Sequence, residues 1–407
     1  MSSLPVRDDR GEWPEEAARV DFDLSAEHRL FRDTVRDFAE KEVVPGAIER
    51  DRTHEFPTGI VTQMGRMGLL GVPFPEQYGG AGGDTLSYAI AVEEISRADG
   101  SLGLTLAAHT SLGASPFYLF GTEAQKERWL VPLAQGEFLG AFGLTEPTAG
   151  SDAGGTKTVA LRDGDEWVIN GSKLYMTSGR VAGVMVITAR TSNDPKQRHI
   201  TSFIVPAGTP GVSFGKDEDK MGLRSSVTSA VFFENARIPA ENVLGHEGAG
   251  FKQFLEILDG GRISIGAMAV GLGQAALDAA LQYAQTREQF GQPIGNFQAI
   301  QFKLADMATQ LEAARLLVYK AAYLKDRKRP FAKEAAMAKL FASEVGEMCA
   351  YQAIQIHGGV GYVVEGQVER MYRDVRLTTI GEGTSEIQRL VIARYLLKDA
   401  ALSLGRG

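Results

Sequence analysis

The sequence predicts a mainly α-helical protein with a central β domain. Apolar residues recur at helical spacing up to about residue 137 and again from about residue 245, whereas the stretch between them consists of short β-favouring segments separated by turns. No helical pattern separates those segments, so we expect a compact antiparallel β domain and no βαβ array. The expected parts are a loose charged tail (1–23), an α-helical domain (24–137), a β domain (138–244) and an α-helical bundle (245–407).

The N-terminal part shows helix signals in sequence order. Residues 24–44 carry one apolar face after a Ser25 cap, and Pro45 is expected to end that helix. A second helical segment precedes Gly68, and the glycine-rich residues 78–83 predict a loop. Further helical patterns cover Ala89–Arg97, Leu104–Leu112 and Glu123–Leu133.

The middle part shows strand signals. Asp163-Gly164 and Asn170-Gly171 are typical of turns between strands. The predicted strands are Phe138–Leu144, Lys157–Leu161, Glu166–Ile169, Val184–Ala189, His199–Val205 and Thr228–Phe233. In the C-terminal part, Ile300, Leu304, Met307 and Leu311 form one apolar stripe, Ala335–Val345 favours a helix, and Asp326–Pro330 is a short connector. Long helices with short connectors indicate an antiparallel bundle.

Composition excludes several classes of function. The net charge of −8 argues against nucleic acid or an anionic membrane as a partner. Cys349 is the single cysteine, and the six histidines have no ligand spacing, so we expect neither a disulfide nor a metal site. The sequence shows no signal peptide and no uncharged apolar run long enough to span a bilayer. A cytoplasmic location is therefore predicted.

The most informative stretch surrounds Glu382, which has glycine on both sides. Gly381 and Gly383 lack Cβ atoms, so a ligand can approach the main chain closely there. Thr384 or Ser385 can cap the following helix, and Ser385 with Gln388 has the spacing of a capping box. Taken alone, this stretch fits a solvated loop acid at least as well as a functional one.

Other loops are rich in glycine and hydroxyl groups. Residues 142–155 follow a predicted strand, where Thr145, Ser151 and successive N–H groups are suited to a phosphate or heterocycle. Residues 170–179 are expected to form a hairpin that carries Tyr175 and Thr177 beside that loop. Gln355–Gly359 lies at a helix end, and Arg287, Gln289 and Phe290 lead into a turn at Gly291. An ordinary β connection, a sheet surface, a glycine C-cap and a solvated helix end remain the alternatives.

From about residue 24 onward the chain resembles the acyl-CoA dehydrogenases, with the short-chain, butyryl-like branch most similar. The motifs that carry the resemblance occur in the family's order and are Tyr78-Gly-Gly, Phe142–Ser151, Tyr175-Met-Thr177, Thr286-Arg-Glu-Gln-Phe-Gly291, Gln355–Gly359 and Gly381-Glu-Gly-Thr-Ser-Glu386. The resemblance implies a β-barrel-like middle domain and a C-terminal four-helix bundle. It also implies bound FAD, an acyl-CoA substrate, electron-transferring flavoprotein as electron acceptor, and a homotetramer built as a dimer of dimers.

The resemblance also assigns residues. Glu382 matches the base that removes the α-proton, and Ser151, Asp259, Arg262 and Gly383 match substrate contacts. The residues that match FAD contacts are Phe142, Leu144, Thr145, Gly150, Ser151, Tyr175, Met176, Thr177, Arg287, Gln289, Phe290, Gln298, Gln355, Ile356, Gly358, Gly359, Thr384, Ser385 and Glu386; of these, Arg287, Gln298 and Gln355–Gly359 match residues that reach FAD across a subunit interface. For the Asp259–Arg262 pair, a surface ion pair is the alternative.

Three positions refine the expectation. Some family branches place the base in the helix containing Gly261, which has no side chain here. Gly381 replaces an aromatic residue common before the base and is expected to open or reshape the acyl pocket, and Tyr175 stands where many relatives have tryptophan. The sequence therefore predicts an acyl-CoA dehydrogenase that forms trans-2-enoyl-CoA. The alternatives are an oxidase or monooxygenase of the same fold that uses O₂, and a helical scaffold without catalytic activity.

Overall fold

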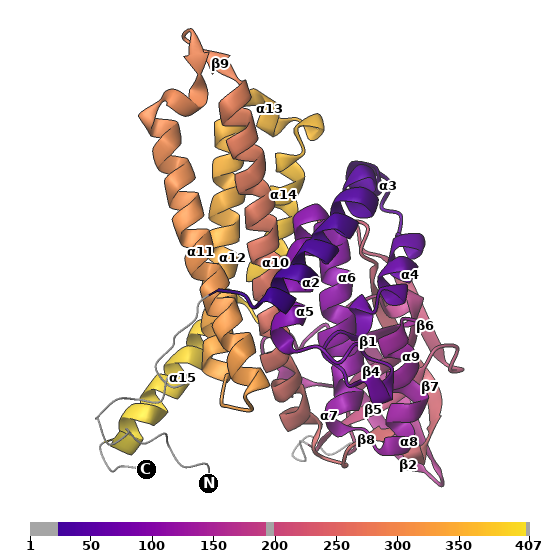
Figure 1. The fold of residues 1–407 in the computed structure, drawn as a ribbon. Helices are drawn as coiled ribbons and strands as arrows, with labels where there is room; N and C mark the ends of the chain where they lie inside the picture. Colours follow the sequence, from indigo (N-terminus) through magenta and orange to yellow (C-terminus); the bar gives the residue numbers. More distant parts are fainter. Residues whose placement is uncertain (1–22, 193–198, 404–407) are drawn as a thin grey trace.

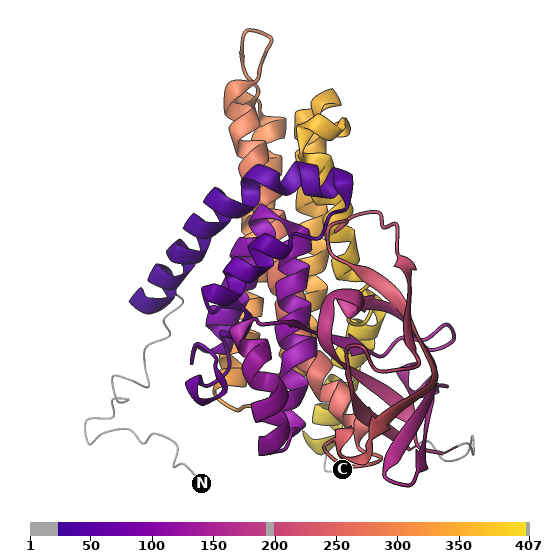
Figure 2. The same ribbon diagram turned by 90° about the vertical axis from the view of Figure 1, so that its right-hand side faces the viewer.

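The computed structural model describes residues 23–192 and 199–403. The predicted tail lies almost wholly outside these residues. The chain is helical, then β, then helical, as the sequence predicted. Figure 1 shows the long C-terminal helices standing beside the N-terminal helices, with the sheet at the lower end of the molecule. Figure 2 shows the same arrangement from the side, with the sheet against the lower part of the helices.

The N-terminal helices begin as the sequence predicted. The Ser25 hydroxyl accepts a hydrogen bond from the His28 N–H and caps the first of them. Pro45, however, does not end the helical path, because it lies in a tight turn that leads directly into the next helix. The helices are α2 (Ala26–Phe38), α3 (Ala47–Thr53), α4 (Thr58–Arg66), α5 (Thr85–Ala98), α6 (Gly100–Ala108), α7 (Ser115–Phe120), α8 (Glu123–Gln125) and α9 (Val131–Gln135).

The β domain is one eight-stranded sheet. Its strands are β1 (Leu139–Gly143), β2 (Val159–Asp163), β3 (Glu166–Thr177), β4 (Ala182–Arg190), β5 (Ile200–Pro206), β6 (Val212–Asp217), β7 (Thr228–Pro239) and β8 (Val243–Leu244). They follow the order β6-β7-β3-β2-β4-β5-β8, and β1 also pairs with β4. Within the described residues the end strands β6 and β8 do not meet, so the predicted barrel-like domain is an open sheet and not a closed barrel.

Two details of the sheet differ from a purely antiparallel plan. β1 runs parallel to β4, because the chain returns to the same end of the sheet between them. Asn170-Gly171 does not form a turn: β3 continues through it, with a register shift at Gly171, whose φ is +145°. A second shift lies between Lys173 and Met176, where Tyr175 has a φ of +54°. The predicted hairpin is therefore one strand with two bulges, and bulges redirect side chains.

Successive residues of β4 face different apolar clusters, as the two-residue period of a strand requires. Met185 and Ile187 pack inside the β domain, whereas Val184 and Val186 pack against the N-terminal helices. At the same contact, a Cβ on Gly113 would lie 2.6 Å from the Gly140 carbonyl carbon, so the helical segment before α7 lies directly on β1. The start of the 142–155 loop is thereby fixed against the N-terminal domain.

The C-terminal helices surround one central helix. They are α10 (Gly250–Thr286), α11 (Gln298–Asp326), α12 (Ala332–His357), α13 (Gly359–Tyr362), α14 (Val368–Val375) and α15 (Ser385–Ser403), and the hairpin β9 (Glu288–Gln289) and β10 (Gln292–Pro293) joins α10 to α11. α10 packs against α11, α12 and α5. By length and composition α10 is also apolar enough to cross a bilayer, but 83% of its most apolar stretch is buried within the fold. It is the core helix of the bundle.

All three parts of the chain meet at α14. The Arg373 guanidinium donates to the Asp51 carboxylate of α3 (2.6 and 3.1 Å) and to the Met221 carbonyl of the β domain (3.1 Å). The buried Asp374 carboxylate accepts the Leu223 N–H at 2.6 Å. A Cβ on Gly222 would lie 2.5 Å from the Arg373 carbonyl carbon, so the two main chains are in direct contact. The segment that contains Glu382 follows α14 directly.

Candidate active site

Glu382 lies in a turn between α14 and α15 and has a left-handed backbone conformation. Its φ is +53°, and that of Gly383 is +91°. A non-glycine residue with positive φ costs free energy, and such strain is concentrated at functional sites. The sequence predicted that the turn around Glu382 requires glycine, and the positive φ of Gly383 confirms this requirement at position 383. Gly381 does not have positive φ, and a Cβ there would make only ordinary contacts with Leu377.

The turn conformation directs the Glu382 carboxylate into the protein, against α10. A Cβ built on Gly261 would lie 1.9 Å from Glu382 Oε2. The residue as a whole is partly accessible, but its Oε2 atom is buried and has no hydrogen-bond partner among the described residues. Glycine at 261 therefore leaves the space that the carboxylate occupies, and the reading of Glu382 as a solvated loop acid is wrong.

The surroundings of Glu382 favour its protonated form. Burial raises the pKa of the carboxyl group to about 7, although the nearby Lys339 and Arg262 charges act to lower it. Neither cation forms a hydrogen bond with the carboxylate among the described residues. The Glu382 N–H also has no hydrogen-bond partner in the described part of the chain. The site thus combines an acid that titrates near neutral pH with a free N–H of the same residue.

The turn is held by side chains that the sequence reading did not assign. Lys339 of α12 donates from Nζ to the Gly383 carbonyl at 2.7 Å. Gln388 donates from Nε2 to the same carbonyl at 2.9 Å and to the Glu382 carbonyl at 3.2 Å. The predicted capping box between Ser385 and Gln388 is therefore wrong, because the Gln388 amide binds the turn. Instead, the Thr384 hydroxyl accepts the Ile387 N–H at 3.3 Å and caps α15.

The predicted substrate residues Asp259 and Arg262 both lie on α10, close to Glu382. Arg262 is only 4% exposed and forms an ion pair with Asp259, so the pair is not a surface bridge. Burial raises the pKa of Asp259, with the Arg262 charge opposing that shift. Arg262 Nε is buried and has no partner in the part of the chain that the structure describes, which leaves one donor available. Ser151, by contrast, lies in the exposed loop after β1.

A buried ion pair supports the 142–155 loop. Lys173 is fully buried in β3 and donates from Nζ to Glu146 Oε1 (2.7 Å) and to the Leu144 carbonyl (3.2 Å). The Glu146 carboxylate also accepts the N–H groups of residues 157 and 158. Burial lowers the pKa of Lys173 to about 8, against the effect of Glu146. The Lys173–Glu146 pair therefore ties both ends of the loop together, with Lys173 at Leu144 and Glu146 at residues 157 and 158.

The predicted cofactor residues of the β domain differ in their accessibility. Tyr175 is 64% exposed, Gly150 and Ser151 are exposed, and Phe142, Leu144, Thr145 and Thr177 are partly buried. The Met176 side chain is buried in the core of the sheet, so only its main chain is available to a ligand. These residues form one group at the end of β1 and β3.

The remaining cofactor residues lie in two other places. Thr384, Ser385 and Glu386 line a shallow groove of about 220 Å³ at the start of α15, and Ser385 Oγ is buried with no partner within residues 23–192 and 199–403. Arg287, Gln289, Phe290, Gln298, Gln355, Ile356, Gly358 and Gly359 gather around the β9–β10 hairpin and the end of α12. Figure 1 places this hairpin at the end of the bundle remote from the sheet, and Figure 2 agrees. One chain alone does not bring the two ends together.

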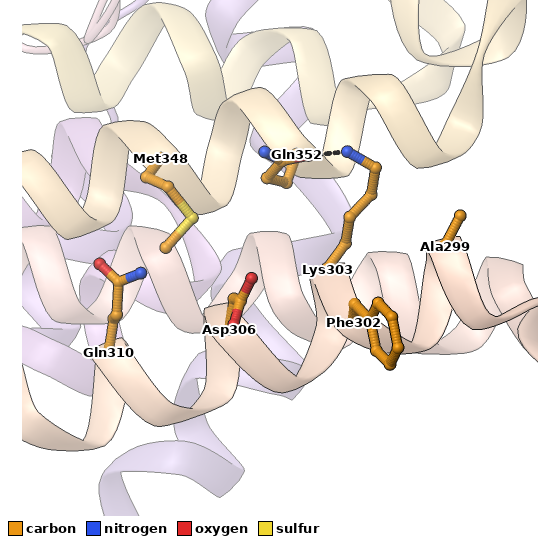
Figure 3. A pocket seen from close by; sticks show the side chains of 7 residues that line it. All are labelled: Ala299, Phe302, Lys303, Asp306, Gln310, Met348 and Gln352. Carbon is orange, nitrogen blue, oxygen red and sulfur yellow. Dashed lines mark hydrogen bonds between the residues drawn. The ribbon is translucent and has the colours of Figure 1, made fainter.

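Another groove is lined by none of the predicted site residues. It lies between α11 and α12 and has a volume of about 490 Å³. Figure 3 shows its lining residues Ala299, Phe302, Lys303, Asp306, Gln310, Met348 and Gln352. Lys303 spans it and donates to Gln352 Oε1 at 2.6 Å. Within the described residues, no group of histidine, cysteine, aspartate or glutamate side chains is arranged to hold a metal ion.

Comparison with known proteins identifies the family. Three family models match in order: the acyl-CoA dehydrogenase N-terminal domain (residues 25–137), middle domain (141–236) and C-terminal domain (248–397). The probable acyl-CoA dehydrogenase YngJ of Bacillus subtilis is 59% identical over 93% of this chain and 100% of its own length. The mitochondrial short-chain specific acyl-CoA dehydrogenase of Mus musculus is 51% identical over 93% of this chain and 92% of its own length.

Solved structures agree with the sequence relatives. Butyryl-CoA dehydrogenase from Megasphaera elsdenii has a TM-score of 0.91 at 46% identity, covering 93% of this chain and all of that one. A chain solved in a study of the electron transferring flavoprotein of Acidaminococcus fermentans has a TM-score of 0.92 at 48% identity, with the same coverage. An acyl-CoA dehydrogenase from Bacillus anthracis, complexed with FAD, has a TM-score of 0.89 at 38% identity, covering 95% of this chain and 69% of that one. The chain therefore belongs to the acyl-CoA dehydrogenases, a family of oxidoreductases.

Proposed function

We propose that the protein is an FAD-dependent acyl-CoA dehydrogenase that converts an acyl-CoA thioester into trans-2-enoyl-CoA, with Glu382 as the base. The observation that carries this proposal is the Glu382 carboxylate, whose buried Oε2 has no hydrogen-bond partner among the described residues and is held against Gly261 by a strained turn. A general base is most effective when its pKa lies near the working pH. Burial brings the pKa of Glu382 to about 7, which meets that requirement.

The reaction needs a second group to stabilise the thioester oxygen while the α-proton leaves. Charge develops on that oxygen, and fixed N–H donors are well suited to it. The free Glu382 N–H is such a donor, and it belongs to the same residue as the base. Glycine at 383 leaves the main chain uncovered, so the thioester can lie against it. Arg262 and Asp259 are proposed to contact the substrate from α10.

The residues at the end of β1 and β3 fit a flavin. They offer a partly exposed aromatic ring at Tyr175, hydroxyl groups at Thr145 and Thr177, and open main chain at Gly150, where a Cβ would contact nothing within 4 Å. We propose that these residues hold the isoalloxazine ring and pyrophosphate, together with Phe142, Leu144, Ser151, the Met176 main chain, Thr384, Ser385 and Glu386. When bound, FAD supplies the acceptor for the hydride that leaves the β-carbon.

The residues around the β9–β10 hairpin and the end of α12 are proposed to bind the FAD of a second copy of this chain. Phe290 is 92% exposed, and Cβ atoms on Gly358 and Gly359 would meet nothing within 4 Å, so this end of the chain is open. The hairpin lies at the end of the bundle away from the sheet, which supports contact with a different FAD from the one bound at β1 and β3. A homotetramer built as a dimer of dimers, with Arg287, Gln289, Phe290, Gln298 and Gln355–Gly359 reaching across, accounts for both groups.

The substrate is proposed to be a short or short-branched acyl-CoA, and electrons are proposed to pass to electron-transferring flavoprotein. The short-chain and butyryl-CoA specificities of the relatives support the first part, and the study of the Acidaminococcus electron transferring flavoprotein supports the second. At the site, Gly381 leaves room beside Leu377 that a side chain would fill. A cytoplasmic location remains a prediction.

Glu382→Gln tests the role of the base directly. The variant should purify yellow, with FAD bound, but anaerobic addition of butyryl-CoA should no longer bleach the flavin. The rate of flavin reduction is expected to fall by at least about 10²-fold, because general-base catalysis contributes roughly 10²–10⁴. Glu49→Gln, at an exposed acid of α3, is the control and should bleach normally. Bleaching of Glu382→Gln at the parent rate would show that another group is the base.

A further inference from the structure

Lys339 is a buried lysine whose charge faces the proposed active site. It is 0% exposed and lies in the middle of α12, on a face otherwise formed by the buried Ala335, Ala338 and Ala342. A buried ammonium group costs free energy unless it is paired or hydrogen-bonded. The only hydrogen-bond acceptor that Nζ has among the described residues is the Gly383 carbonyl, at 2.7 Å. This lysine therefore acts on the turn that carries Glu382.

The charged groups around Glu382 come from several elements. Lys339 faces it from α12 and Arg262 from α10, and Tyr88 of α5 also lies within electrostatic reach of the carboxylate. Burial lowers the pKa of Lys339 to about 8, with Glu382 acting to raise it and Arg262 to lower it. Glu386, at the start of α15, is a further acid near Lys339. Arg262 already shares its charge with Asp259, whereas Lys339 has no hydrogen-bonded acid among the residues that the structure describes.

We propose that Lys339 is a positioning residue of the dehydrogenation reaction: it fixes the Glu382–Gly383 turn through the Gly383 carbonyl, and its buried positive charge stabilises the ionised Glu382 carboxylate. This inference rests on the proposed function of Glu382 as the base. Gln388 shares the first task, because its amide binds the same carbonyl, but it carries no charge. The two residues therefore allow the effect of the hydrogen bond to be separated from the effect of the charge.

The test compares three substitutions by the pH profile of kcat/KM with a short-chain acyl-CoA. Lys339→Met removes both the donor and the charge, so the acidic limb of the profile should move to higher pH by about 1 unit, the size expected for loss of a nearby opposite charge. Gln388→Met removes a donor only, so activity should fall while the limb stays in place. Lys333→Met removes a partly exposed lysine from the same helix and should change neither. An unmoved limb in Lys339→Met would overturn the proposal.

A second measurement does not depend on turnover. The Glu382 carboxyl signal can be titrated by ¹³C NMR in glutamate-labelled protein and assigned by its loss in Glu382→Gln. Its pKa should be higher in Lys339→Met than in the parent, and an equal pKa in both proteins would contradict the proposal. If no acyl-CoA is dehydrogenated, the proposed function fails, but this titration still decides whether Lys339 controls the charge of Glu382.

A stability cycle covers the case in which Lys339→Met folds poorly. At a pH where Glu382 is ionised, loss of Lys339 leaves a buried carboxylate without its cation, so Lys339→Met should destabilise the parent more than it destabilises Glu382→Gln. The free energies of unfolding of all four proteins give the coupling directly. Equal losses in both backgrounds would show that the Lys339 charge does not act on the Glu382 carboxylate, which would contradict the proposal.

Discussion

Gly261→Ala should separate catalysis from stability at the proposed active site. The added Cβ would lie 1.9 Å from Glu382 Oε2, a distance that real Cβ atoms do not show, so the carboxylate must retreat by about 1 Å. The end of a glutamate side chain can move at little cost to folding. Alanine is also favoured over glycine within a helix by about 1 kcal/mol. We therefore expect a folded protein of at least parent stability whose base is displaced.

The catalytic cost follows from the displacement. A misplacement of about 1 Å between reacting groups lowers rates by about 10²-fold, which corresponds to roughly 2.7 kcal/mol of barrier. The assay is stopped-flow reduction of the bound flavin by butyryl-CoA under anaerobic conditions, with thermal unfolding measured in parallel. Gly260→Ala is the matched control, since its Cβ would meet only the flexible Lys325 Nζ at 3.3 Å and brings the same gain in helix propensity.

The pair of variants makes the outcome decisive. Slow flavin reduction in Gly261→Ala with near-parent reduction in Gly260→Ala would confirm that the carboxylate occupies the space above Gly261. Parent-like rates in Gly261→Ala would refute the reasoning, because the working carboxylate would then lie elsewhere. Equal losses in both variants would also refute it, since the cause would be the helix and not the contact with Glu382.

Two further predictions concern buried charges. Lys173→Met leaves the Glu146 carboxylate buried without its cation and frees the Leu144 carbonyl, so urea unfolding should show a loss of about 3–5 kcal/mol and FAD should dissociate more readily; an effect as small as that of Lys41→Met, at an exposed ion pair, would contradict this. The pKa of Glu382 is raised in the folded state to about 7, so its contribution to stability is fully present below the unfolded pKa and is lost as pH rises through about 7. Glu382→Gln should therefore be more stable than the parent at about pH 8, by up to about 3 kcal/mol, and the advantage should shrink toward about pH 5. A stability difference that does not change with pH would show that the folded protein does not raise this pKa.

Local sequence signals predicted most of the fold but not its irregularities. The Ser25 cap and the apolar stripe of α11 follow from residues close together in the chain, and the structure confirms the helices they predict. Asn170-Gly171 was misread because a glycine with positive φ is required in both a tight turn and a bulge. Pro45 was misread because proline is tolerated in the first turn of a new helical segment as well as after an old one. Whether the sheet is open depends on which strands pair with each other, and no local sequence pattern predicts that pairing.

The candidate site was predicted in part. The two glycines around Glu382 mark the turn, and the requirement for glycine is met at Gly383. The contact with Gly261 and the hydrogen bond from Lys339 join residues far apart in sequence, so no short motif contains them. One signal was present: Lys339 falls on the buried alanine face of its helix, where a lysine requires an explanation.

The junction at α14 has a consequence for how the active site forms. Arg373 and Asp374 bind main-chain or side-chain groups of the other two parts of the chain only a few residues before Glu382. A fragment containing the bundle alone would retain the acid but lose the Asp51, Met221 and Leu223 anchors that set the path of the chain into the turn. The geometry around Glu382 therefore depends on contacts with all three parts of the chain. Cleavage within any one part by limited proteolysis should shift the other two relative to each other.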